Sequence, residues 1–303
     1  SDRYATASLR RLEEVAKALE LDISPIAELR PTQRCDDPSH YEIQWDLFPV
    51  KEMYRRHWFE WFNGSLSDAM AHRVELVRTF VRQAMPRRQP VFLRHKARFG
   101  AEMDPYALWA WQCRITLLAR DVHLSTSFSR SFLTPDWFRR LLKLSRENDG
   151  PCRAKKALLE IGIPLVVEPH LPKTYLDGAA FLLPSGTPII GITLRYDRLD
   201  NFWFVLIHEL VHVRNHLRKG KLEEIFDDLE SEPDELERNT DQLAGSIMIA
   251  DEQWETALPR YLRTEESVID FAQEVGIHPA IVAGRIRKEA ENYVILSNLV
   301  GRG

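Results

Sequence analysis

The sequence predicts an α+β fold, with a mainly helical N-terminal half and a C-terminal half that adds a small β-sheet. The first observation is helical apolar spacing in segments such as SLSDAMAHRVELVRTFVRQAM and PYALWAWQCRITLLARDV. The second is a change after Gly162 to short β-like runs, IPLVVEP, GAAFLL and TPIIGITL, of which the last two are joined by the turn-forming PSGT. The third is the apolar helix FWFVLIHELVHVRNHLRK, which follows these runs with Asn201 as its expected N-cap.

Composition predicts a soluble globular protein. The 303 residues suffice for two compact domains, and the net charge of −4 gives no general attraction to nucleic acid. No apolar run reaches membrane-spanning length, so we expect no membrane association. The three cysteines, Cys35, Cys113 and Cys152, lie far apart and form no CxxC pair, which favours a reducing cytoplasm over disulfides or thiolate zinc sites.

Four segments are expected along the chain. Residues 1–29 have the pattern of a helix, a turn and a second short helix around LRRLEEVAKAL. Residues 30–50 contain three prolines and no periodicity, so they are predicted to be a linker. Residues 51–149 are predicted to form a helical connector domain, and residues 150–303 a separate domain that contains the β-like runs.

The stretch HELVH carries the chemistry of the second domain. His208 and His212 are four residues apart and therefore face the same side of a helix, where zinc can accept both imidazole nitrogens. Glu209 lies about 100° around the helix, which suits a general base that does not ligate the metal. The alternative is a pair of ordinary core histidines, but two buried imidazoles without partners would be costly among Val205, Leu206 and their aliphatic neighbours.

A catalytic zinc usually has three protein ligands, so a third is needed. His216 continues the four-residue spacing but lies about 12 Å along the axis from His208, so we expect it to be an exposed helix-end histidine. Glu237 is the expected ligand because it begins an amphipathic helix, and Asp241 is expected to orient a ligand histidine from the next turn. The other acidic residues considered lie in an acidic stretch from 223 to 235, which is predicted to be a solvated connection: Glu230, Glu232 and Glu235.

With HELVH, ERNTDQLAGSIMI and TYLDGAAF in place, the second half resembles the ImmA/IrrE family of metallo-endopeptidases. The resemblance implies a zincin-like metallopeptidase domain with a bound Zn²⁺ and an HExxH helix. That helix is followed in the family by the pattern ExEAxxFA, in which Glu237 matches the first glutamate and Ala244 the last alanine. Asn239 and Thr240 depart from the pattern, and Asp251 stands where the family often has proline.

Residues 8–29 are similar to the closing helices of a Cro/CI-type helix-turn-helix, as found in HigA-like antitoxins that carry this peptidase domain. The resemblance implies a remnant whose recognition helix would lie upstream of Ser1. DNA contact is therefore expected only through a module largely missing from this chain. The family resemblance further implies regulatory proteolysis of a repressor-type protein.

Catalysis on a protein substrate is the first functional hypothesis. An extended peptide is expected to pair with the edge of the sheet at TPIIGITL, and a side chain must stabilise the oxyanion. Tyr175 is the preferred donor, and the alternatives are Arg195, Tyr196 and His278.

The second hypothesis is a DNA-binding regulator or antitoxin whose zinc domain is a docking or sensing platform. In that case the chain would bind a toxin partner, and a homodimer is compatible with either hypothesis. The aromatic residues considered as anchors for such a partner are Trp58, Trp61, Trp109 and Trp111, although a role in the core is the favoured interpretation.

Overall fold

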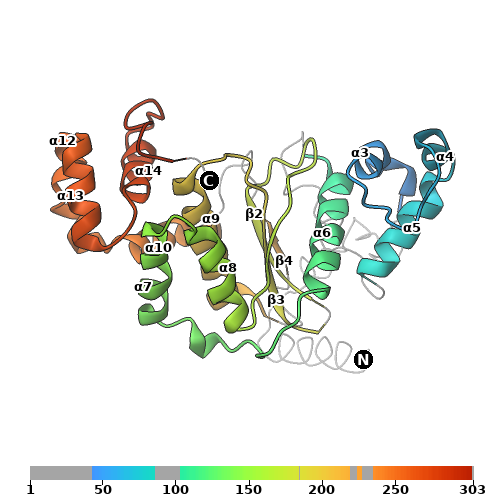
Figure 1. Cartoon of the computed structure of the whole chain (residues 1–303), viewed down its shortest axis with the longest axis horizontal. Helices are drawn as coiled ribbons and strands as arrows, with labels where there is room; N and C mark the ends of the chain where they lie inside the picture. Colours follow the sequence, from blue (N-terminus) through green and yellow to red (C-terminus); the bar gives the residue numbers. More distant parts are fainter. Residues whose placement is uncertain (1–42, 86–102, 184, 219–223, 227–234, 302–303) are drawn as a thin grey trace, which may run out of the picture. The chain divides into compact units, whose positions relative to one another are not determined.

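The computed structural model describes residues 43–85, 103–183, 185–218, 224–226 and 235–301. The predicted helix-turn-helix remnant at 1–29 and most of the predicted linker at 30–50 lie outside these residues. The chain divides into two units, Ser1–Ile43 and Gln44–Gly303, and the description below concerns the second. The α+β fold class predicted from the sequence is confirmed, because helices predominate and surround one small sheet (Figure 1).

Helices precede the sheet. They are η2 (Trp45–Leu47), α3 (Val50–Arg55), α4 (Leu66–Ala71), α5 (Arg73–Ala84), α6 (Pro105–Arg120), η4 (Arg130–Phe132), α7 (Pro135–Lys143), η5 (Leu144–Arg146) and α8 (Gly150–Glu160). Capping residues start several of them: Asp104 accepts hydrogen bonds from two backbone N–H groups of α6, and Thr134 accepts one from α7, each with proline at the first helical position.

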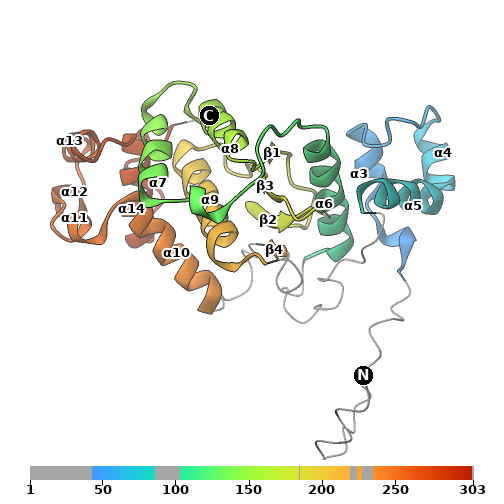
Figure 2. The ribbon, with the colours of Figure 1, turned by 90° about the horizontal axis from the view of Figure 1, so that it is seen from below.

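The sheet has four strands in the order β1-β3-β2-β4. They are β1 (Leu165–Val167), β2 (Gly178–Leu182), β3 (Pro188–Ile192) and β4 (Glu224–Phe226). β3 pairs in parallel with β1 and antiparallel with β2, while β4 pairs antiparallel with β2. Figure 2 shows the strands in this order.

Two expectations about the sheet were wrong. TPIIGITL forms β3, an interior strand with partners on both sides, so it has no open edge for a peptide. The acidic stretch predicted to be only a solvated connection contains strand β4, whose three residues pair with Ala179–Phe181. A three-residue strand between acidic residues is too short to show the alternating pattern by which strands are recognised.

Two long helices pack on opposite faces of the sheet (Figure 2). A Cβ atom at Gly191 of β3 would lie 2.6 Å from the indole of Trp111 in α6. A Cβ atom at Gly178 of β2 would lie 2.6 Å from Val205 and 2.8 Å from the Glu209 carboxylate in α9 (Leu199–Val211). Gly178 pairs with Ile192, and Gly191 with Ala179, so the two glycines alternate in register and face opposite sides.

The remaining helices follow β3 in the chain, with η6 before β4 and the others after it. They are η6 (His212–His216), a π-helical turn, then α10 (Glu235–Met248), α11 (Asp251–Glu255), α12 (Leu258–Leu262), α13 (Glu265–Val275) and α14 (Pro279–Glu289). Both α10 and α14 contact α9, which makes α9 the centre of the main hydrophobic core. Its N-cap is Arg198, so the expected cap Asn201 lies inside the first turn instead.

The aromatic residues of the first half mostly serve its core. Trp58, Trp109 and Trp111 are at most 2% exposed, and Trp58 stacks on Phe80 at 6.0 Å between ring centroids. Only Trp61 of the four considered anchors is exposed, at 40%. The core role, which was the favoured interpretation of these tryptophans, is therefore confirmed for three of them. Among the described residues, no helix has both the length and the apolar character that crossing a bilayer requires.

Candidate metal centre

Helix α9 and the residue that follows it place three polar side chains in the core. They are His208, Glu209 and His212, which lie among apolar residues in the sequence FWFVLIHELVHV and are 2%, 1% and 0% exposed. Ionisable groups are buried in this way when they are paired or when they hold a metal. The packing of α9 between the sheet and α10 thus directs three titratable side chains into a water-poor space.

Three donor atoms converge on one point. His208 Nε2 lies 2.9 Å from His212 Nε2 and 3.1 Å from Glu237 Oε2, and His212 Nε2 lies 3.4 Å from the same Glu237 oxygen. Ligands at about 2.0–2.1 Å from a tetrahedral zinc are themselves about 3.3 Å apart. The triangle of donor atoms therefore fits a zinc ion with little adjustment, and these are the residues that group as a metal site.

The hydrogen bond at Nδ1 of His208 determines whether its Nε2 carries a hydrogen or a lone pair. Nδ1 lies 2.9 Å from Asp241 Oδ1, and a carboxylate only accepts, so Nδ1 carries the hydrogen. The Nε2 of the neutral ring then has only a lone pair, and it faces the carboxylate of Glu237 and the ring of His212. The Nε2 lone pair of His208, the ring of His212 and the Glu237 carboxylate can therefore serve together as metal ligands, since imidazole nitrogen and carboxylate oxygen are donor atoms that zinc accepts.

Asp241 is held from a further helix. Lys288 of α14 donates to Asp241 Oδ2 at 2.7 Å, and its ammonium group lies 4.3 Å from the ring centroid of Phe204 in α9. The chain Lys288–Asp241–His208 therefore links α14, α10 and α9 and fixes the orientation of the imidazole. Lys288 was not singled out in the sequence, because it lies 47 residues after the aspartate and carries no local motif.

His216 supports the other imidazole. The π-helical turn η6 widens the spacing after α9 and brings His216 Nδ1 within 3.0 Å of His212 Nδ1. The expectation of an exposed helix-end histidine was wrong, because the ring is partly buried against His212. The four-residue spacing of HVRNH already placed the two rings on one face, and this was the available signal.

The electrostatics favour an ionised carboxylate and neutral imidazoles. Burial raises the pKa of Glu237, but the adjoining imidazoles of His208 and His212 outweigh this effect and bring the value to about 2. Burial lowers the pKa of His212, which keeps its ring neutral near pH 7 and suited to bind a metal. Asp241 is also lowered in pKa, since hydrogen bonds from His208 and Lys288 overcome the effect of its burial.

Glu209 occupies a separate position beside this cluster. Its side chain passes directly over Gly178 at the start of β2, where only a hydrogen atom in place of Cβ leaves room for the carboxylate. The glutamate is therefore held between α9 and the sheet, one residue from a converging histidine and outside the triangle of donor atoms. That separation is what a proton-transferring group next to a metal requires.

The structure places the four oxyanion candidates differently. Tyr175 has a left-handed backbone at φ 46°, and the centroid of its ring lies 5.6 Å from the guanidinium carbon of Arg195. Tyr196 also packs against Arg195, at 5.5 Å. His278 has a structural role as the N-cap of α14, where Nδ1 accepts from the backbone N–H of Ala280. The catalytic role expected for Tyr175 stays a prediction.

Two converging histidines and a carboxylate, with a glutamate following the first histidine on one helix, define a metallopeptidase-type site. Residues 161–287 match the family model described as the IrrE N-terminal-like domain, Peptidase_M78. This match points to a peptidase and supports the resemblance to the ImmA/IrrE family in that part of the chain. Comparisons with curated proteins and with solved structures give no significant match.

Proposed function

We propose that this chain is a zinc-dependent endopeptidase, with His208, His212 and Glu237 as the ligands, Asp241 as the residue that orients His208, and Glu209 as the general base. The observation that carries the proposal is the triangle of donor atoms, 2.9, 3.1 and 3.4 Å on its sides, with Glu209 beside it on α9. The matched family is a metallopeptidase family, and zinc has the ligand preferences of this donor set.

Glu209 does the proton transfers in this proposal. A zinc ion bound by the three ligands supplies Lewis acidity at neutral pH. The Glu209 carboxylate takes a proton from the attacking water as the water oxygen adds to the scissile carbonyl carbon. The same carboxyl group then donates that proton to the leaving amine nitrogen as the C–N bond breaks. Tyr175 is proposed as the donor to the developing oxyanion.

The peptide would lie along β4. The side of β4 away from β2 pairs with no strand among the residues that the structure describes, so its backbone can pair with an extended substrate. β4 also neighbours β2, whose first residue lies against Glu209. Such pairing recognises the extended backbone and takes specificity from alternate side chains.

The proposed substrate is a repressor-type regulatory protein, which follows from the resemblance of residues 8–29 to a helix-turn-helix and from the peptidase family. The test is to incubate purified protein and its Glu209→Gln variant with a helix-turn-helix repressor encoded beside it. We expect zinc-dependent cleavage by the parent, a loss of at least about a hundredfold in the variant, and equal zinc content in both. Equal cleavage by the variant would reject Glu209 as the base.

The alternative function is that of a regulator or antitoxin that docks a toxin. It is favoured by one observation, the exposed apolar side chains of α12, where Leu258, Tyr261 and Leu262 are 60%, 67% and 57% exposed. A small toxin that co-purifies with the parent and with Glu209→Gln, but not with a Tyr261→Ser variant, would support this alternative.

A further inference from the structure

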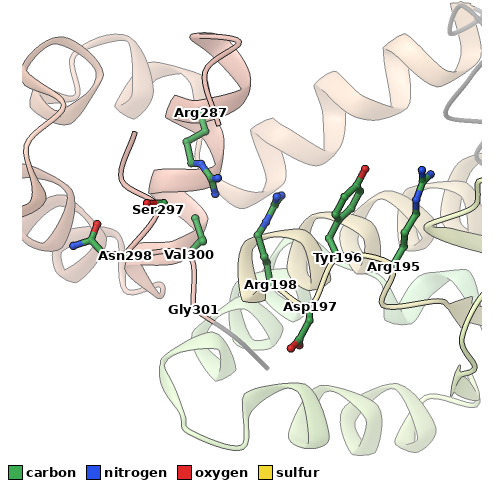
Figure 3. Close-up of a pocket in the computed structure, with 9 residues that line it drawn as sticks. All are labelled: Arg195, Tyr196, Asp197, Arg198, Arg287, Ser297, Asn298, Val300 and Gly301. Atoms are coloured by element: carbon green, nitrogen blue, oxygen red, sulfur yellow. The ribbon is translucent and has the colours of Figure 1, made fainter. Parts of the chain in front are cut away.

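A cavity lies at the opposite end of α9 from the metal centre. It measures about 620 Å³ and is formed by the segment before α9, by α14 and by the last described residues (Figure 3). Its lining residues are Arg195, Tyr196, Asp197, Arg198, Arg287, Ser297, Asn298, Val300 and Gly301. The C-terminal wall is held in place by a hydrogen bond from the Leu199 N–H to the Val300 carbonyl, at 3.1 Å.

Arg287 is the unusual residue of this cavity. It is only 4% exposed, yet its Nε and Nη1 atoms make no hydrogen bond among the described residues. Nη2 donates to the Tyr293 carbonyl, and Nη1 lies 3.8 Å from Asp200 Oδ2, which is too long for a hydrogen bond. A buried guanidinium with two unsatisfied donor atoms is costly unless something else accepts from them.

Arg198 faces Arg287 across the cavity. In Figure 3 the two side chains extend toward the same space, whereas Asp197 points away from it. Burial lowers the pKa of Arg287, and the nearby charge of Arg198 lowers it further. Arg195 adds a third guanidinium to the lining, and the buried Asp200 is the carboxylate that pairs with Arg198, at 3.0 Å.

The N-terminus of α9 also borders the cavity. Arg198 is its N-cap and makes no side-chain capping hydrogen bond, while Asp200 in the first turn offsets the positive end of the helix dipole. The three arginines of the lining are accompanied by two aspartates, Asp200, which lies beside Arg198 and Arg287, and Asp197, which points away, so an excess of positive charge remains. Tyr196, 44% exposed, adds an aromatic surface that lies 5.3 Å from the Arg198 guanidinium.

We propose that this cavity binds the phosphoryl group of a small anionic molecule, with Arg287 and Arg198 as its principal contacts and Arg195 at the rim. Guanidinium groups match phosphate oxygens with paired N–H donors, and the Arg287 guanidinium lines the cavity with part of its donor capacity unused among the described residues. The volume is in the range of sites for small molecules, so the remainder of the ligand can lie against Tyr196.

This site is separate from the peptidase centre. Arg198 and His208 are ten residues apart on α9, which corresponds to about 15 Å along the helix. The two sites are nevertheless connected by the same rigid helix and by α14, which carries both Arg287 and Lys288. A phosphorylated ligand bound at one end of α9 therefore contacts elements that also hold the metal centre.

The experiment is a calorimetric titration of the purified full chain with inorganic phosphate, compared with acetate at equal ionic strength. We expect phosphate to bind and acetate to bind at least about tenfold more weakly, because only phosphate has enough oxygens for both facing arginines. The variants Arg287→Lys and Arg198→Gln should each weaken phosphate binding by about tenfold or more.

Two further variants keep the test decisive. Arg195→Gln removes a half-buried arginine of the rim, and it preserves a readout if Arg287→Lys does not fold. Arg139→Gln removes an arginine of α7 that is 72% exposed and outside the cavity, with the same change in charge. Binding weakened by the cavity variants and not by Arg139→Gln supports the site. The proposed site is overturned if phosphate does not bind or if acetate binds equally well. It is also overturned if phosphate binding survives in all the cavity variants, which is the result expected for binding at the metal centre.

Discussion

Helices α6 and α9 lie on opposite faces of the same sheet, and each approaches it at a glycine. At Gly191 the space left by the missing Cβ is filled by the Trp111 indole of α6, whose Nε1 donates to the Glu168 carbonyl at 3.0 Å. At Gly178 the equivalent space on the other face is filled in part by the Glu209 carboxylate of α9. A glycine in the strand thus makes room for an aromatic ring on one face of the sheet and for a carboxylate on the other.

The two helices differ in the kind of side chain that they bury, apolar residues in α6 and ionisable residues in α9. Along α6 the buried residues are mainly aromatic and aliphatic, and burying Trp111 contributes directly to stability. Along α9 and the first residue of η6, the buried His208, Glu209 and His212 cost stability unless partners or a metal compensate for their lost hydration. A glycine in a strand can therefore serve the core or a reaction, and the residue facing it distinguishes the two.

Removing a ligand should have the largest effect. His212→Ala, at the start of η6, is expected to weaken zinc binding by at least about a hundredfold, because one of three ligands is lost. Trp111→Phe on α6 is the matched change, and it should leave zinc affinity unchanged while removing one hydrogen bond. Competition with a chelating dye measures both, and a parallel loss in the two variants would contradict the comparison.

Removing the group that orients His208 should have an intermediate effect. Asp241→Asn keeps the size of the side chain but places an uncharged amide against Nδ1, and we expect zinc affinity to fall by about 10- to 100-fold. The helix itself should persist, as circular dichroism can verify. An unchanged affinity would show that Asp241 only pairs with Lys288 on the surface.

The two glycines provide the sharpest contrast. Gly178→Ala and Gly191→Ala should each lower the free energy of unfolding by about 1–3 kcal/mol, since both place a Cβ atom 2.6 Å from a side chain. Only Gly178→Ala should also lower peptidase activity at full zinc occupancy, because it displaces Glu209. Denaturant unfolding and a zinc-saturated activity assay separate the two effects, and equal losses of activity would refute the assignment.

The smallest effect is expected at Lys288. Its side chain is 54% exposed, so Lys288→Met should weaken zinc binding by about fivefold or less, through a looser Asp241. The matched change Lys143→Met at the end of α7 should have no effect on zinc. A loss as large as that of Asp241→Asn would mean that the lysine has a more direct role.

Local patterns were enough to predict the helix α9 and to select His208, His212, Glu237 and Asp241, which the structure brings close together, because helical periodicity places side chains three and four residues apart on one face. The strand order was not accessible in this way. TPIIGITL has the same pattern in an interior or an edge strand, and only long-range pairing with Leu165–Val167 decides that it is interior. Lys288 and Arg287 likewise acquire their roles from tertiary contacts of α14.

X-ray absorption at the zinc edge, on protein loaded with one equivalent of zinc, tests the central claim most directly. The account predicts two imidazole nitrogens at about 2.0–2.1 Å, with the remaining shell made of oxygen. It also predicts that one imidazole contribution disappears in His212→Ala. A shell without imidazole, or one that includes sulfur at about 2.3 Å, would contradict the proposed metal centre.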